Sequence, residues 1–151
     1  MAEHRSSIEI DADAETVFEF LVTEAGMTTW MGRHAELDPR AGGVFAVDIA
    51  GYAIRGTYLE VERPHRVLVS WGMAGSEALP PGASEVEFTL TPTAAGTRVD
   101  LHHRGLPATE VPGHADGWAN FLPRLAIAGA GGDPGTDSWT PLPDQPLTEE
   151  P

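Results

Sequence analysis

The sequence predicts an α+β fold, in which an antiparallel β-sheet is covered by a long C-terminal helix and one or two short helices follow the first strand. The apolar residues have a period near 3.6 after residue 13 and again after residue 113, which is typical of helices. Between residues 33 and 106 the period is 2, and turn residues divide this segment into about six strands. The short connections between these strands favour antiparallel pairing.

The composition excludes several classes of enzyme and cofactor site. The 151 residues include no Cys, and all nine basic residues are Arg. Without Cys the chain cannot form disulfides, Cys-ligated zinc sites or iron–sulfur clusters. Without Lys it can form neither a Schiff base nor the phosphate contact of a P-loop. We expect no cofactor.

The chain is strongly acidic, with 23 Asp and Glu residues and a formal net charge of −14. Such a surface repels phosphate groups, and the Arg residues are scattered, so nucleic acid and anionic membranes are not expected partners. No apolar run exceeds about four residues, whereas a signal peptide needs roughly 7–15 and a membrane span roughly 20. We therefore expect a soluble, cytoplasmic protein without membrane insertion.

The composition changes near residue 131. Residues 131–151 hold five Pro, five acidic residues and no Arg. Such a segment cannot bury enough apolar surface to offset the entropy of ordering it. We predict one domain over residues 1–130 and an irregular, Pro-rich acidic tail over residues 131–151, from which Trp139 and Leu142 can dock on the domain.

The domain is expected to begin with a strand that ends at Ile10, because residues 6–10 end in a polar and apolar alternation. Asp13 is a suitable N-cap for the helix that follows, since its carboxylate can accept a hydrogen bond from a free backbone N–H. Four residues share one face of this helix: Val17, Phe18, Leu21 and Val22. Residues 28–32 indicate a second, short helix, in which Trp30 is expected to close one end of the core.

The six later strands have a face that we assign to the C-terminal helix. It carries Phe45, Val47, Ile49, Ile54, Tyr58, Val67, Val69, Trp71, Met73, Val86, Phe88, Leu90, Val99, Leu101 and His103. The residues between them are polar, for example Glu87 and Asp100, and Asp48 is expected to face solvent. An antiparallel sheet with one apolar and one solvated face follows from this alternation.

The last helix is expected from about Gly113 to Ala130. Apolar residues recur in it at helical spacing and predict packing across the sheet: Trp118, Phe121, Leu122, Leu125 and Ala126. Pro123 lies inside this segment. Because proline removes one backbone donor and crowds the carbonyl four residues before it, we expect a kink or a break there.

Several short motifs occur in the order found in a known family. They are GG at 42–43, GTYLEV at 56–61, RPHRV at 63–67, SW at 70–71, LTP at 90–92, GTR at 96–98, HRGLP at 103–107 and HADGW at 114–118. Together with the order of elements, they resemble the AHSA1-like (activator of Hsp90 ATPase homologue 1-like) branch of the SRPBCC, or START-like, superfamily. The resemblance spans about residues 5–130.

This resemblance implies a helix-grip fold, in which a curved antiparallel sheet wraps around the long C-terminal helix. It also implies a cavity between sheet and helix, which the superfamily uses for lipids, polyketides, hormones and other largely apolar small molecules. Hsp90 itself is not an expected partner, because the activator has an additional N-terminal domain without a counterpart in these residues. A homodimer is a further hypothesis, which the resemblance also suggests.

The expected cavity would be lined by residues of the apolar sheet face and of the last helix. We predict ligand-binding roles for Tyr58, Trp71, Phe88, His103, Trp118, Phe121 and Leu122. The aromatic residues with a polar atom suit an oriented, mostly apolar ligand, although core packing explains them equally well. His103 is the ionisable residue expected there, either as a neutral core histidine with a hydrogen bond or as a ligand or catalytic group.

Other candidate sites are weaker. His102 and His103 point to opposite faces of their strand and cannot share one metal ion inside the cavity, so we expect no metal site. His114 is expected to make a cap or loop contact, and Trp118 to anchor the last helix on the sheet. The glycine-rich segment 129–132 follows a helix, whereas a dinucleotide-binding loop must follow a strand.

Three functions remain open from the sequence. The first is a small-molecule binding protein that holds a largely apolar ligand. The second is an enzyme, of the aromatase/cyclase or hydrolase type, in which His103 acts as a general acid or base. The third is an interaction module, associated with a chaperone, that acts through the outer sheet face or the acidic tail.

Overall fold

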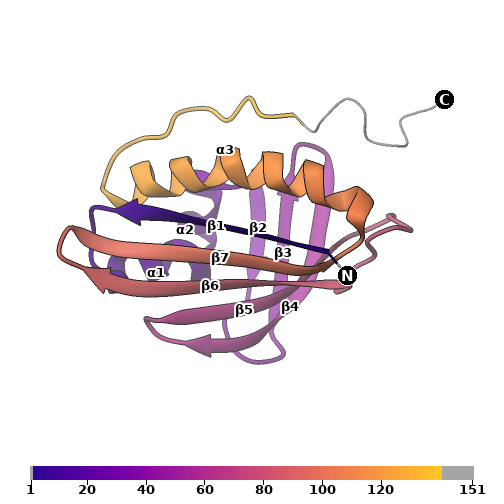
Figure 1. Cartoon of the computed structure of the whole chain (residues 1–151), viewed down its shortest axis with the longest axis horizontal. Coiled ribbons are helices and arrows are strands. Elements are labelled where there is room, and N and C mark those ends of the chain that lie inside the picture. Colours follow the sequence, from indigo (N-terminus) through magenta and orange to yellow (C-terminus); the bar gives the residue numbers. More distant parts are fainter. Residues whose placement is uncertain (1, 141–151) are drawn as a thin grey trace.

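A seven-stranded sheet curves around one long helix in the computed structural model, which describes residues 2–140 (Figure 1). In chain order the elements are β1 (Ala2–Ile10), α1 (Ala14–Val22), α2 (Glu24–Trp30), β2 (His34–Leu37), β3 (Val44–Ile49), β4 (Tyr52–Glu62), β5 (Arg66–Met73), β6 (Ser84–Thr93), β7 (Gly96–Leu106), the 3-10 helix η1 (Ala108–Glu110) and α3 (Val111–Gly129). This is the α+β helix-grip architecture that the sequence predicts, including six strands after residue 33.

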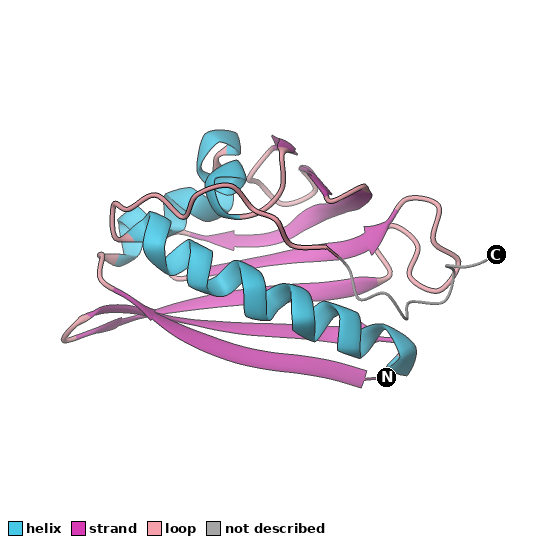
Figure 2. Cartoon of the chain, turned by 90° about the horizontal axis from the view of Figure 1, so that it is seen from above, coloured by secondary structure: helices cyan, strands magenta, loops and turns pink. Residues whose placement is uncertain are grey.

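All neighbouring strands are antiparallel, in the order β1-β7-β6-β5-β4-β3-β2. The alternation predicted from the sequence holds: Val86, Phe88 and Leu90 of β6 are buried, and the polar residues between them are half-buried. Figure 2 shows that α3 crosses one face of the sheet, whereas α1 and α2 lie at one end of it. The large apolar side chains of the sheet therefore meet α3 and the two short helices.

The outer face of the sheet is covered by ion pairs. Glu87 lies at its centre and accepts hydrogen bonds from Arg66 and from Arg104, the latter at 2.9 Å. Arg55 pairs in the same way with Asp48 at 3.0 Å, which confirms that Asp48 lies on the outer side. Because the arginines are matched by carboxylates, this face carries no basic patch of the kind that binds nucleic acid.

Two hydrogen bonds hold α1 in place. Asp13 caps α1, since its carboxylate accepts from the backbone N–H of Thr16 at 2.8 Å, as predicted. The hydroxyl of Tyr58, on β4, donates to the carbonyl of Leu21 in α1 at 3.0 Å, and both residues are buried. This bond connects the last turn of α1 to the sheet.

Of the kink or break expected at Pro123, the break is wrong, because α3 is one helix from Val111 to Gly129. The kink stays a prediction. Pro123 lies on the solvent-facing side of the helix, and so does Ala119, whose carbonyl loses its usual partner. Water can therefore hydrogen bond to that carbonyl. The amphipathic face that packs on the sheet is not interrupted.

After α3 the chain turns back and runs along the helix, without a helix or strand between residues 131 and 140 (Figures 1 and 2). Arg124 of α3 donates to the carbonyls of Pro134 and Gly135, at 3.1 and 3.0 Å. Trp139 is half-buried against the domain, whereas Leu142 lies outside the described residues. A domain boundary near residue 130 stays a prediction.

No helix in the described part of the chain combines the length and the hydropathy needed to cross a membrane.

The bond between Tyr58 and Leu21 can be tested by removing one hydroxyl. We expect Tyr58→Phe to lower the free energy of unfolding by about 1–3 kcal/mol, because the Leu21 carbonyl would stay buried without its donor. Tyr52→Phe is the matched control, since the Tyr52 hydroxyl has no hydrogen-bond partner among residues 2–140. Urea unfolding of both variants measures the difference, and equal stabilities would contradict the prediction.

Candidate functional site

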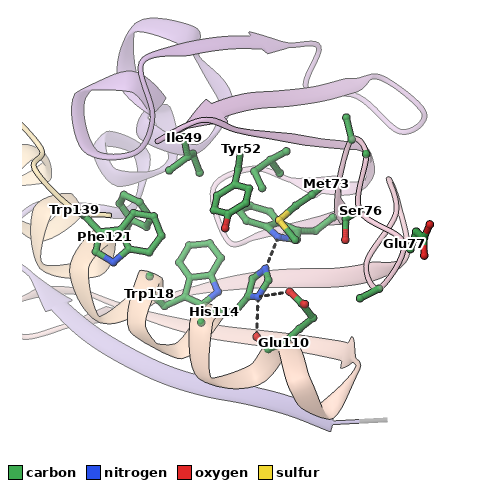
Figure 3. Close-up of a pocket in the computed structure, with 17 residues that line it drawn as sticks. Ile49, Tyr52, Met73, Ser76, Glu77, Glu110, His114, Trp118, Phe121 and Trp139 are labelled. Carbon is green, nitrogen blue, oxygen red and sulfur yellow. Dashed lines mark hydrogen bonds and ion pairs between the residues drawn. The ribbon is translucent and has the colours of Figure 1, made fainter. Parts of the chain in front are cut away.

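A cavity of about 660 Å³ lies between the sheet and the N-terminal half of α3 (Figure 3). The sheet contributes Ile49, Tyr52, Ile54, Trp71 and Met73 to its wall. Glu110, at the end of η1, and α3 contribute the facing residues Gly113, His114, Gly117, Trp118 and Phe121. The loop 74–78 and Trp139 complete the lining.

Helical spacing explains the composition of the α3 wall. Glu110, His114, Gly117, Trp118 and Phe121 follow one another at intervals of one, three or four residues and therefore share one face of the helix. Gly117 leaves room on this face, since a Cβ atom there would meet the Trp139 ring at an ordinary contact distance of 3.5 Å. The side chains of His114, Trp118 and Phe121 thus line the cavity from the side of α3.

The loop 74–78 is positioned by the strand before it. The backbone N–H of Met73 donates to the carbonyl of Leu79 at 2.8 Å, and the Leu79 side chain is fully buried. At Gly72 the returning chain comes so close that a Cβ atom would lie 1.8 Å from the Pro80 carbonyl oxygen. Only glycine permits this approach, which fixes one end of the cavity.

Two hydrogen bonds between tryptophan and histidine connect α3 to the sheet in opposite directions. Trp71 of β5 donates from Nε1 to Nε2 of His114 in α3 at 3.2 Å. Trp118 of α3 donates from Nε1 to Nδ1 of His103 in β7 at 3.1 Å. Sheet and helix therefore each supply one donor and one acceptor, and we name these four residues the Trp–His latch.

The hydrogen bonds of His103 define which of its ring nitrogens carries the proton. Ser84 donates its hydroxyl hydrogen to the carbonyl of Trp71 at 2.7 Å, so its oxygen must accept from His103 Nε2, which lies 2.9 Å away. His103 is therefore neutral, with its proton on Nε2. Burial, helped by the neighbouring histidines, lowers its pKa to about 2.

His114 has the opposite tautomer to His103. Its Nε2 accepts from Trp71, so its proton is on Nδ1, which donates to the backbone carbonyl of Glu110 at 2.9 Å. Burial lowers the pKa of His114, and the interactions with Glu110 act in the other direction without reversing the shift. Both histidines of the latch thus act as neutral acceptors for indole N–H groups.

Glu110 places a carboxylate in the cavity wall, with its side chain only 11% exposed. The closest basic atom is Nδ1 of His114, 3.8 Å from Oε1, and this distance is too long for a hydrogen bond. Within residues 2–140 no donor makes a hydrogen bond to this carboxylate. Glu110 also precedes the first turn of α3, where the free backbone N–H groups favour a negative charge.

Of the seven residues predicted to bind a ligand, the structure brings three together in the cavity wall: Trp71, Trp118 and Phe121. The other four are buried in the core without lining the cavity: Tyr58, Phe88, His103 and Leu122. Tyr58 turns its hydroxyl toward α1, and His103 lies behind the ring of Trp118.

The sequence reasoning missed Tyr52, Glu110 and Trp139 as cavity residues, and it assigned His114 only to a cap or loop contact. Two signals were available. Tyr52 precedes Ile54 and Tyr58 with the same period of 2, and Glu110 precedes His114 and Trp118 with a period of four. Both patterns extend an amphipathic face by one residue toward its N-terminus.

No group of three or more His, Cys, Asp or Glu side chains suited to a metal ion occurs among the residues that the structure describes.

The fold and the cavity together define a helix-grip domain, and comparison with known proteins gives the family. The sequence profile of the family "Activator of Hsp90 ATPase homolog 1-like protein" matches residues 11–129. The chain belongs to this family, as the sequence motifs predict. A comparison with curated proteins finds no match.

Several solved structures are similar to this chain. The AHSA1-like protein from Rhizobium etli is 37% identical, with a TM-score of 0.72, over 92% of this chain and 88% of its own. The Aha1 dimer from Colwellia psychrerythraea is 23% identical, with a TM-score of 0.74, over 87% and 98% of the two chains, and it shows the shared fold. DynU16, from the dynemicin biosynthetic locus, is 26% identical with a TM-score of 0.77, over 91% of this chain but 51% of its own.

The buried His103 predicts a pH dependence of stability. Its folded-state pKa of about 2 lies below the ordinary value of 6.5, so the unfolded chain binds a proton that the folded chain does not. Stability is therefore complete above pH 6.5 and is lost as the pH falls, by about 1.4 kcal/mol for each unit. Urea unfolding between pH 8 and pH 5 should show a loss of about 2 kcal/mol from this residue.

His103→Gln should flatten this profile, although it lowers stability at pH 8 because the latch loses an acceptor. Leu101→Ala is the control: it also destabilises the core, by about 2–5 kcal/mol, but retains every histidine and should keep the wild-type slope. An unchanged slope in His103→Gln would contradict the assignment.

Proposed function

We propose that this protein binds a largely apolar small molecule in the cavity between the sheet and α3. One observation carries the proposal: a space of about 660 Å³ has five aromatic side chains in its wall and few polar groups. The aromatic residues are Tyr52, Trp71, Trp118, Phe121 and Trp139. Sites for small ligands have this size and this character, with a few polar groups that orient the ligand.

The energetics are adequate for such a ligand. Removing roughly 300 Å² of apolar surface from water yields about 7.5 kcal/mol, at about 25 cal/mol for each Å². Part of this free energy offsets the lost translational and rotational freedom of the ligand. The walls themselves need little ordering, because the latch already fixes Trp71 and Trp118.

The geometry gives no support to His103 as a catalytic residue. Its ring is fully buried, does not line the cavity, and uses both nitrogens in hydrogen bonds to Ser84 and Trp118. A general acid or base must reach the proton that it transfers.

The interaction module and the homodimer stay predictions. Among the similar proteins, the one from Colwellia psychrerythraea is a dimer.

The binding proposal can be tested with N-phenyl-1-naphthylamine, an uncharged fluorescent probe. We expect its emission to rise, the tryptophan emission to fall and the melting temperature to increase. A ligand selective for the folded state adds about 2.7 kcal/mol of stability at a hundredfold excess over its Kd. Absence of all three signals would contradict the proposal.

Gly117→Leu should fill the cavity and weaken probe binding at least tenfold. Its Cβ meets only the Trp139 and Phe121 rings at contact distances, and glycine is the weaker helix former, so the variant should fold. Ala119→Leu adds the same side chain on the exposed side of the same helix and should bind like the wild type. Equal affinities of the two variants would show that the probe binds elsewhere.

The tail is expected to contribute to binding more than to folding. A chain that ends after Gly132 should lose less than about 2 kcal/mol of stability, because typical surface changes cost little. It should bind the probe more weakly, since Trp139 is part of the cavity wall. Trp139→Ala in the full chain should reproduce the loss of affinity, and unfolding of the shortened chain would contradict the domain boundary near residue 130.

A further inference from the structure

We propose that the ligand carries a protonated amine, which binds to the carboxylate of Glu110, while the aromatic walls hold its apolar part. The inference rests on the proposed function and adds the chemical class of the ligand. It also assigns Glu110 as the residue that determines specificity.

The first argument is the missing partner of Glu110. A carboxylate withdrawn from water costs free energy unless hydrogen bonds or an opposite charge compensate it. Its side chain is 11% exposed, and within residues 2–140 no donor reaches it. His114 cannot supply the charge, because its Nδ1 proton goes to the Glu110 carbonyl and its Nε2 accepts from Trp71. A ligand ammonium group offers both N–H donors and a positive charge.

The second argument is the set of rings around this carboxylate. Tyr52 faces Glu110 across the cavity in Figure 3. Burial raises the pKa of the Tyr52 hydroxyl, and the negative charge of Glu110 raises it further. Trp71 on the sheet side and Trp118 on the α3 side add two larger rings to the cavity wall. Aromatic faces attract ammonium groups and bind apolar groups equally well, so they suit both parts of such a ligand.

The third argument concerns the sign of the charged side chains in the cavity lining. Its described lining contains two carboxylates, Glu77 and Glu110, and no arginine. An anionic ligand would meet negative charge without a compensating cation, and a neutral ligand would leave Glu110 without charge compensation. The amine is therefore the ligand class that this lining favours.

Three probes of matched size separate these ligand classes: 1-naphthylmethylamine, 1-naphthylmethanol and 1-naphthoate. Isothermal titration calorimetry of the full chain at pH 7 should show the amine binding at least tenfold more tightly than the alcohol, and the carboxylate most weakly. Glu110→Gln should reduce the affinity for the amine to that for the alcohol and change the affinity for the alcohol by less than twofold. Glu110→Asp, which withdraws the carboxylate by one methylene group, should weaken amine binding selectively.

Glu36→Gln is the matched control, because it removes the same charge from an exposed position on β2, outside the cavity lining. It should leave the preference for the amine unchanged. The preference should also persist in 0.5 M NaCl, whereas attraction to the net charge of the surface would be screened. Equal affinities for amine and alcohol, or equal effects of Glu36→Gln and Glu110→Gln, would overturn the inference and leave the proposed function intact. Failure of all three probes to bind would contradict both.

Discussion

The buried indole N–H groups of Trp71 and Trp118 need hydrogen-bond acceptors, and the rest of the site depends on which residues supply these acceptors. Each is satisfied by a histidine of the opposite layer, so the hydrogen bonds run from sheet to helix and from helix to sheet. A buried donor without a partner costs about 1–3 kcal/mol, and two such donors would amount to a large part of the stability of a small domain. The latch therefore fixes the position of α3 over the sheet more specifically than apolar packing alone, which is not directional.

This arrangement also explains why a cavity remains. Four large rings meet between β5, β7 and α3, with centroids 5.2 Å apart for the two tryptophans and 4.9 Å apart for the two histidines. Because the four rings of the latch fill the space between α3 and strands β5 and β7, they hold the N-terminal half of α3 away from β3 and β4. The space left there is lined by three of these rings, Trp71, His114 and Trp118, and by Tyr52. The tautomers that the latch requires also prevent His114 from acting as a cation toward Glu110.

The sequence predicted the elements well because their signals are local. The N-cap at Asp13, the alternation that buries His103 and the apolar face of α3 depend on neighbours a few residues away. The effect of Pro123 depended on which side of α3 faces solvent, and that side is set by packing with the sheet. The site was predicted less completely for a similar reason. Glu110 and Tyr52 acquire their roles only when the start of α3 lies opposite the start of β4, and this pairing joins segments almost 60 residues apart.

The family relationship defines the fold, whereas function depends on the residues of the site. Chains that share 23% identity have this fold, so the architecture alone does not select a ligand. The net charge of −14 does not select one either, since salt at 0.1 M screens exposed charges beyond about 10 Å and the acidic surface merely enriches cations near the entrance. Glu110 differs from that surface, because its side chain is only 11% exposed and lies in the cavity wall. A charge in such a place is screened less than an exposed one. Under the binding proposal, this is the carboxylate with which a ligand in the cavity would interact most strongly.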